Sequence, residues 1–412
     1  MIVRSLKMQN YRGIDELHIN FDQRINVFVG INGSGKSSIL SCLAKMLSSV
    51  IYPVYTKKRQ SIPFSEFDIR NGAEKLDVEI AIGSDEGNLY SWKRALVRNG
   101  PKTTETPELK EYIKFVNTCI EKDESFPIPV IVFYSVGRAV LDIPQRIRNR
   151  HSFDTRYSGF ESSIQGSGDF RLFFEWFRER EAYVNGMILD GKQDVTDHQF
   201  SSVCAAITAL TNFENLRIRR FPQRMILEKY GETLDLDQLS DGEKCLMAMV
   251  GDMAMRLSIA NPSHQDPLKA QAVFLIDEVD LHLHPEWQRM VLPKLLEVFP
   301  NSQFIVSTHS TQILTHIKPE NIFRIKRSGS GIVMNHPADS YGQTQDSLYN
   351  DIMEVPIRPD CVQKQFRNLY DAIDRKDLKQ AKETLDALSS AIGDDAELVK
   401  AEIQIKRRGL GR

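Results

Sequence analysis

The chain has 412 residues, of which 41% are hydrophobic and 26% charged, and its formal net charge is −2. This is the composition of an ordinary globular protein, and the length exceeds what one hydrophobic core usually supports. No apolar run approaches the roughly 18 residues of a membrane span. The five scattered cysteines form no CxxC pair, which argues against disulfides and structural zinc. We therefore expect a cytoplasmic protein with no membrane partner and more than one structural unit.

The N-terminal region predicts strands that lead into a phosphate-binding loop. Residues 1–29 read as strands with a turn at 10–14, and the apolar run 25–29 predicts a buried strand. Directly after it, residues 30–37 read Gly-Ile-Asn-Gly-Ser-Gly-Lys-Ser, which fits the pattern GxxxxGK[ST]. Glycines let backbone N–H groups close around phosphates at the positive end of the following helix, which we expect over 38–50.

This loop predicts binding of a nucleoside triphosphate. Lys36 is expected to reach the β- and γ-phosphates, and Ser37 to offer its hydroxyl to Mg²⁺. The alternative, a glycine-rich turn with a chance lysine, is disfavoured by the strand and helix on either side. The residues expected to contact the nucleotide here are Gly30, Asn32, Gly33, Ser34, Gly35, Lys36, Ser37 and Ser38.

The middle of the chain predicts a hairpin, helices and basic clusters. Segments 76–82 and 89–97 read as a hairpin, and the apolar stripe of a helix over 169–189 favours core packing rather than a ligand site. Arginines and lysines gather at 57–59, 138–156 and 217–224. In the third cluster apolar residues alternate with arginines, as in a half-buried strand. Each cluster either contacts nucleic acid or is simply a solvated face.

Residues 239–244, Leu-Ser-Asp-Gly-Glu-Lys, open a helix that runs to about Ala260. Its apolar residues predict one buried face and are Leu246, Met249, Val250, Met253 and Leu257. An ordinary N-cap at Ser240 or Asp241 would also explain the polar start of this helix.

A second strand ends in two carboxylates. The apolar run 272–276 predicts a strand buried on both faces, and Asp277 and Glu278 follow it. Carboxylates at the C-terminal end of a parallel strand face the ligand crevice, although an acidic pair can also be a solvated turn. Asp277 is suited to the Mg²⁺ shell, and Glu278 to orienting or deprotonating the water that attacks the γ-phosphate.

The remaining elements complete a sheet and form a tail. One more apolar strand ends just before His309, and strands follow over 321–326 and 332–334. After a linker at 339–344, three short amphipathic helices over 361–373, 378–392 and 396–407 form either a docking element or a solvated cap.

Together these motifs resemble the ABC ATPases, whose signature motif carries Gly and Gln where this chain has Asp241 and Glu243. The resemblance implies two heads that bind two ATP head-to-tail, and therefore a dimer or a higher oligomer. Ser240 and Gly242 would then contact the γ-phosphate bound to the partner, and Asp280 would cross the interface. His309 would sense the γ-phosphate and, with Lys36 and Glu278, form the catalytic group.

The Asn-Tyr-Arg turn at 10–12 resembles SMC-like and RecF-like ATPases, in which the arginine approaches the nucleotide. Arg12 is therefore a candidate nucleotide contact, although an isolated surface arginine is the simpler interpretation. The glutamine that the family places near Mg²⁺ has no clear counterpart, and Gln60 and Asp68 are both candidates. No heptad repeat continues over several heptads in the middle of the chain, so the long coiled coil of true SMC proteins is not expected.

The resemblance implies an α/β fold: an ABC-type P-loop ATPase head, with a mixed sheet and flanking helices, a helical lobe insertion and a C-terminal helical tail. We expect an N-terminal ATPase lobe over 1–135 and an inserted helical lobe over 136–230. The signature, acidic strand and switch histidine occupy 231–338, and the linker and tail occupy 339–412.

The whole chain resembles the standalone ATPase subunits of Septu-type and retron-associated anti-phage defence systems. That resemblance implies a separate HNH-type nuclease as partner and, in retrons, a reverse transcriptase with its multicopy single-stranded DNA. The alternative is a RecF-like DNA-repair ATPase that binds DNA ends or junctions. A non-hydrolysing scaffold or transporter subunit is disfavoured by the intact Glu278 and by the long separation of the phosphate loop from Ser240.

Overall fold

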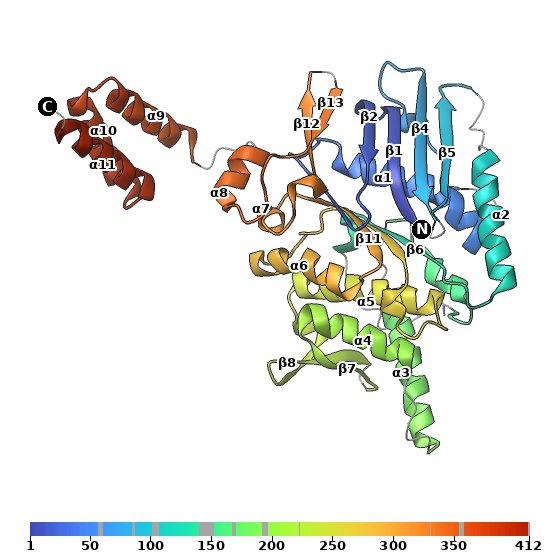
Figure 1. Cartoon of the computed structure of the whole chain (residues 1–412). Helices are drawn as coiled ribbons and strands as arrows, with labels where there is room; N and C mark the ends of the chain where they lie inside the picture. Colours follow the sequence, from blue (N-terminus) through green and yellow to red (C-terminus); the bar gives the residue numbers. More distant parts are fainter. Residues whose placement is uncertain are drawn as a thin grey trace. The chain divides into compact units, whose positions relative to one another are not determined.

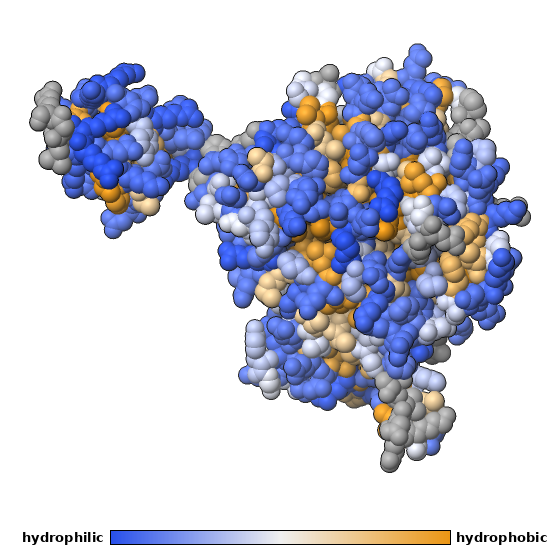
Figure 2. Space-filling model, viewed as in Figure 1, coloured by the Kyte–Doolittle hydropathy of each residue, from blue (hydrophilic) through white to orange (hydrophobic). Residues whose placement is uncertain are grey.

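The computed structural model describes residues 1–56, 61–84, 87–100, 107–139, 152–166, 170–191, 197–221, 223–329, 331–353 and 358–410. The chain divides into two compact units, Met1–Gln345 and Asp346–Arg412. Figure 2 shows that hydrophilic side chains cover most of the face in view on both units.

The first unit contains a four-stranded antiparallel sheet in the order β2-β1-β4-β5 (Figure 1). Alternation along these strands buries residues such as Leu6 and Ile80 on one face. The predicted hairpin pairs Gly83 with Leu89, and helix α2 (Pro107–Lys122) packs on β5. The strands are β1 (Ile2–Tyr11), β2 (Ile14–Asn20), β4 (Lys75–Gly83) and β5 (Leu89–Val97).

A six-stranded mixed sheet in the order β13-β12-β3-β11-β10-β6 forms the centre of this unit. All its pairings are parallel except that of β12 with β13. Every residue of β3, β10 and β11 is buried, which explains why apolar residues make up all of β10, dominate β3 and form the centre of β11 at 304–306. The strands are β3 (Ile25–Val29), β6 (Val130–Tyr134), β10 (Ala272–Ile276), β11 (Ser302–Thr308), β12 (Ile322–Ser328) and β13 (Gly331–Asn335).

Helix α1 (Lys36–Ile51) packs against β6, β10 and β11. By length and composition the helical stretch Lys36–Thr56 could span a membrane, but 72% of its most apolar window is buried in the head. It therefore has the burial of a core helix. The predicted α/β architecture, a mixed sheet with flanking helices, is confirmed.

Helix α5 (Asp241–Ala260) differs from its prediction. We expected one apolar face, yet every residue over 245–260 is buried. The reason is that other helices cover its outer side, and that Arg256 and Asp252 pair inside the protein at 2.8 Å. The other helices of this unit are α3 (Phe170–Leu189), α4 (His198–Thr211), α6 (Pro285–Val298) and the short α7 (Thr311–Leu314).

A small antiparallel sheet, β7 (Glu214–Arg219), β8 (Arg224–Lys229) and β9 (Glu232–Asp235), lies near α4 (Figure 1). The predicted half-buried strand is β7, with Leu216 buried between exposed neighbours. After β9 the single turn η5 (Leu236–Gln238) leads into α5.

The basic character of this small sheet is partly neutralised. Arg219 and Arg224 lie 3.5 Å and 3.3 Å from the carboxylate of Asp235. Of the other two basic clusters, 57–59 and most of 138–156 lie outside the described residues.

The second unit is a bundle of the three helices that the amphipathic pattern of the tail predicted. Its helices are α9 (Asp360–Asp374), α10 (Leu378–Ile392) and α11 (Ala396–Leu410), while the short α8 (Gln345–Leu348) lies at the division between the units. Residues such as Leu369 and Leu388 are fully buried in a core of its own.

Candidate nucleotide-binding site

The phosphate loop lies between β3 and α1, and glycine is required at two of its positions. A Cβ at Gly30 would lie 2.4 Å from the backbone oxygen of Ile325, so no side chain fits there. Gly35 has φ of 111°, a left-handed conformation that other residues rarely adopt. The loop therefore has the close-packed, N–H-rich backbone that phosphate binding requires.

The side chain of Lys36 is folded back onto the loop. Its Nζ donates to the backbone oxygens of Gly30 at 2.9 Å and Ile31 at 3.2 Å. Burial lowers the pKa of Lys36 to about 8, and the charges of nearby carboxylates oppose that shift. Within the described residues the third ammonium proton has no acceptor, so Lys36 can still donate to a ligand oxygen.

A buried hydroxyl in the same loop provides a test of whether phosphate fits. Ser34 Oγ is buried and has no hydrogen-bond partner among the described residues. A phosphate oxygen would satisfy this group as well as the remaining proton of Lys36. The loop's donors therefore fit the phosphates of a nucleotide.

Two acidic residues follow β10 and are held by one serine of β11. The hydroxyl of Ser307 donates to Asp277 Oδ1 at 2.5 Å and accepts from the backbone N–H of Glu278 at 2.8 Å. Glu278 has φ of 50°, a strained left-handed conformation of the kind that clusters at functional sites. Ser307 was not among the predicted site residues, although its position just before Thr308 and His309 in a polar strand end was a usable signal.

Asp280 and His309 lie at the same edge of the sheet. Thr308 donates to Asp280 Oδ1 at 2.7 Å, which fixes the segment after the acidic pair. Burial lowers the pKa of His309, the charge of Lys36 lowers it further, and the nearby carboxylates oppose both effects. His309 is therefore neutral at pH 7, with one ring nitrogen able to donate and the other able to accept. The structure thus brings Lys36, Asp277, Glu278, Asp280 and His309 into one electrostatic cluster.

The donors predicted for Mg²⁺ are chemically suitable. Ser37 is exposed at the start of α1, and Asp277 is buried with 3% exposure at the end of β10. A hydroxyl and a carboxylate are the hard oxygen ligands that Mg²⁺ prefers.

Arg12 lies in a turn that Asp68 holds in place. The Nε of Arg12 donates to Asp68 Oδ1 at 3.0 Å, and Asp68 also accepts from Lys45 at 2.5 Å and from Ser65 at 2.9 Å. Burial alone would raise the pKa of Asp68, but these hydrogen bonds and charges lower it below its usual value. Asp68 is thus an ionised anchor of the Arg12 turn rather than an open Mg²⁺ ligand. Gln60, the other candidate, lies outside the described residues.

The turn that opens α5 is built around Ser240. Ser240 is the N-cap of α5 and forms a capping box with Glu243, as the simpler interpretation of this segment held. A Cβ at Gly242 would lie 2.2 Å from the backbone oxygen of His282, so glycine permits close packing on the segment after Asp280. In the described part of the chain, no hydrogen bond or ion pair joins this turn to the phosphate loop of the same chain.

The segment after Asp280 lies beside that turn. His282, Leu283 and His284 share a surface depression with Ser240 and Trp287. His284 accepts from the backbone N–H of Glu286 and so caps α6, which gives it a structural role.

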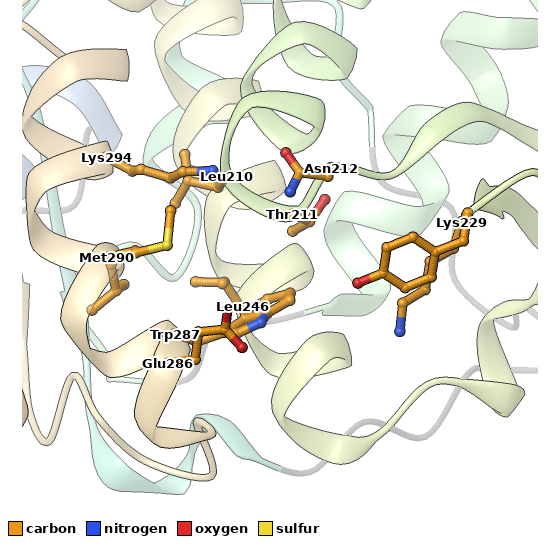
Figure 3. A pocket seen from close by; sticks show the side chains of 11 residues that line it. Leu210, Thr211, Asn212, Lys229, Leu246, Glu286, Trp287, Met290 and Lys294 are labelled. Carbon is orange, nitrogen blue, oxygen red and sulfur yellow. The ribbon is translucent and has the colours of Figure 1, made fainter.

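A cavity of about 120 Å³ lies next to this depression, between α4, α5, α6 and the β8–β9 turn (Figure 3). Trp287 lines both. The other side chains around the cavity that Figure 3 labels are Leu210, Thr211, Asn212, Lys229, Leu246, Glu286, Met290 and Lys294.

Sequence comparison relates the chain to known proteins. Residues 25–315 match the family described as "AAA domain, putative AbiEii toxin, Type IV TA system". The chain is 27% identical to the Retron Ec83 probable ATPase of Escherichia coli, an alignment that covers 98% of this chain and 87% of the relative. It is 22% identical to the Septu protein PtuA of Bacillus thuringiensis, with 76% and 73% covered.

Comparison with solved structures shows that the fold of the first unit is similar to that of an Smc head domain. The Smc head in a complex with the C-winged helix domain of ScpA aligns with a TM-score of 0.50 at 15% identity. The alignment covers 82% of this chain and 98% of that head.

Proposed function

The chain belongs to the family described as "AAA domain, putative AbiEii toxin, Type IV TA system", and we propose that it binds ATP with Mg²⁺ and hydrolyses it. The chain is an SMC-like ATPase related to those of retron and Septu defence systems. The observation that carries the proposal is the cluster of Lys36, Asp277, Glu278, Asp280 and His309 at the carboxyl ends of the parallel strands β3, β10 and β11, where Ser307 and Thr308 hold the acidic segment by hydrogen bonds.

Each residue of the cluster has a role suited to its chemistry. Lys36 neutralises phosphate charge, and Asp277 with Ser37 would hold Mg²⁺, which supplies positive charge at the β- and γ-phosphates when bound. Glu278 is the general base that accepts a proton from the attacking water. His309, neutral at pH 7, donates a hydrogen bond to the γ-phosphate.

The turn around Ser240 that opens α5, which we call the signature turn, supports a head-to-tail dimer. Ser240 is exposed, and its turn packs on the segment around His282 rather than on its own phosphate loop. An exposed N-cap at a helix N-terminus suits a phosphate that a second copy presents. Two copies would then enclose two ATP, each held between one phosphate loop and the other copy's signature turn, with Asp280 near the interface.

The biological role proposed is regulation of a separate effector in a bacterial cytoplasm. The relatives named as retron and Septu proteins support an anti-phage role, and alignment over 98% of the chain favours it over DNA repair of the RecF type. We propose an HNH-type nuclease as the effector, and a reverse transcriptase with its single-stranded DNA as further partners in a retron setting. The three-helix bundle of the second unit, which has its own core, is the candidate docking element.

Steady-state ATP hydrolysis by the purified chain, measured with Mg²⁺ and with EDTA, tests the proposed ATPase activity. Sedimentation with and without ATP tests the proposed dimer. We expect Mg²⁺-dependent turnover and ATP-dependent association. No turnover by a folded protein that binds ATP, in the presence of its co-purifying partners, would overturn the hydrolysis proposal. Tight ATP-dependent binding of the isolated chain to duplex DNA ends would favour the repair function instead.

A further inference from the structure

The turn that opens α5 carries two carboxylates where the proposed function places a phosphate. The Asp241 side chain is 85% exposed, and Glu243 is 15% exposed. Asp241 lies between Ser240 and Gly242, which would contact the γ-phosphate bound to a second copy, and Glu243 follows them directly. An incoming phosphate would be repelled unless these negative charges are compensated.

Glu243 is the carboxylate most closely tied to Ser240. Its Oε2 accepts from the backbone N–H of Ser240 at 3.0 Å and from its hydroxyl at 2.9 Å. The other oxygen, Oε1, accepts from Lys229 Nζ at 2.5 Å. Burial alone would raise the pKa of Glu243, but the hydrogen bonds from Lys229 and Ser240 lower it, so the carboxylate is ionised.

Lys229 reaches Glu243 from a different element. It is the last residue of β8, paired with Glu232 of β9, so the hairpin delivers its side chain to the N-terminus of α5. Its Nζ lies 5.4 Å from the ring centre of Tyr230 and 5.9 Å from that of Phe213. Because the Lys229 side chain is only 25% exposed, water screens its ion pair with Glu243 less than it screens a surface ion pair.

The neighbouring cations do not replace Lys229 at Glu243. Lys244 lies 3.8 Å from Asp241 and so offsets the other carboxylate. Lys294, on the opposite wall of the cavity in Figure 3, donates to the backbone oxygen of Ala209 at 2.7 Å. Among the described residues, Lys229 is the only cation that forms an ion pair with Glu243.

We propose that Lys229 is a positioning residue of the composite ATP site: it neutralises Glu243, and thereby lets the Ser240 turn accept the γ-phosphate of ATP bound to a second copy. This inference rests on the proposed function. When the phosphate arrives, the Ser240 hydroxyl turns from Glu243 to the phosphate, and Lys229 keeps the released carboxylate from repelling it. The residue thus acts on association of two copies and not on the phosphate loop of its own chain.

A double-mutant cycle tests the proposal. Lys229→Met should weaken ATP-driven association, measured by sedimentation, at least about tenfold, since it leaves a partly buried carboxylate uncompensated. In the Glu243→Gln background the same change should have less than about a threefold effect, because glutamine preserves the capping box without the charge. ATP affinity of the separate heads, measured by calorimetry, should not change in either background.

Further variants separate charge from shape and from misfolding. Lys229→Arg should retain association, and Lys269→Met, which removes an exposed lysine paired with Asp266 at 3.1 Å, should behave as wild type. A cooperative melting transition and unchanged ATP affinity would show that each variant is folded.

The outcomes are distinct. If Lys229→Met weakens association equally in the wild-type and the Glu243→Gln backgrounds, the inference about Lys229 is overturned, but the proposed dimer is not. Wild-type association in Lys229→Met would also overturn it. If the wild-type chain itself does not associate with ATP, the proposed function fails, and this inference fails with it.

Discussion

Lys36 is the residue whose removal most directly tests the phosphate loop. Its ammonium is buried, and its one proton without an acceptor in the described structure is available to a phosphate. Lys36→Ala removes a charge-assisted contact worth on the order of 1.5–3 kcal/mol, so ATP affinity should fall at least about tenfold. Calorimetry on the folded variant is the measurement. Unchanged affinity would mean that the loop does not hold the phosphates.

The same residue predicts a pH dependence of ATP binding. Burial holds the pKa of Lys36 at about 8 in the free protein, and bound phosphates favour its charged form. Binding therefore takes up a proton above pH 8: affinity is fully present below that pH and falls by up to about tenfold per pH unit above it. Calorimetry in buffers of different ionisation enthalpy measures the proton. A folded Lys36→Met variant, which cannot take up this proton, is the control.

Glu278→Gln separates nucleotide binding from hydrolysis. The amide keeps the size of the side chain and a hydrogen bond to water but removes the base, and the backbone bond from Glu278 to Ser307 is unaffected. Single-turnover hydrolysis should slow by about 10² to 10⁴. Binding should survive, and sedimentation should show prolonged association with ATP. Wild-type turnover would show that another group is the base.

Among the elements, the small sheet offers a test of nucleic-acid binding. Arg217 and Arg220 are exposed, whereas Arg219 and Arg224 are engaged with Asp235, which also belongs to the capping box of the turn η5. The double variant Arg217→Glu and Arg220→Glu should therefore bind single-stranded DNA more weakly, and the affinity should depend less steeply on salt concentration. Titrations at two salt concentrations measure both.

The control for this prediction is the exposed pair of Lys75 and Asp77 on the four-stranded sheet. Lys75→Glu changes surface charge at a distance from β7 in sequence and in a different sheet, and should leave the affinity as in wild type. Equal affinity and salt slope in the double arginine variant would make β7 an ordinary solvated strand.

The strands around the nucleotide were predictable because both of their faces are buried. The run that became β10 is continuously apolar, and apolar residues dominate β3 and the centre of β11; polar residues of the site lie at or directly after the end of each strand. The sequence did not reveal that Ser307 would hold Asp277 and Glu278 together, since this contact depends on the pairing of β10 with β11.

Other elements were less predictable for physical reasons. We expected one buried face on α5, but Asp252 and Arg256, polar residues of the type that suits a solvated face, pair with each other inside the protein. Likewise β8 and β9 are short, and their pairing depends on the Tyr230-Gly231 turn, where both residues have positive φ. The contact between Lys229 and Glu243 follows from that hairpin and could not be read from spacing.

For the whole molecule, a mixing experiment tests the composite site. Lys36→Ala disables one copy's phosphate loop, and Ser240→Arg disables the other copy's signature turn by placing charge and bulk at an exposed N-cap. Each variant alone should lose nearly all hydrolysis. A mixture should recover part of it, because one of the two sites in the mixed dimer is intact.

Ser240 is the better choice than Gly242 for this experiment. Any side chain at Gly242 would collide with the backbone of His282 in its own copy, which would confound the result with local misfolding. Ser240→Arg should bind ATP normally as a separate head, which calorimetry checks. A mixture that is as inactive as either variant, although mixed dimers form, would count against a site shared between two copies.

The order of the central sheet also governs when the protein becomes functional during its synthesis. The strand β3 precedes the phosphate loop, yet both of its neighbours, β11 and β12, begin roughly 270 or more residues later in the chain. At a synthesis rate of about 5–20 residues per second, the loop emerges roughly 15–55 s before its supporting strand has any partner. A nascent chain on the ribosome therefore carries an exposed apolar strand and no formed nucleotide site. The ATPase becomes competent only after nearly the whole head has been translated, so its early apolar segments depend on protection from aggregation until then.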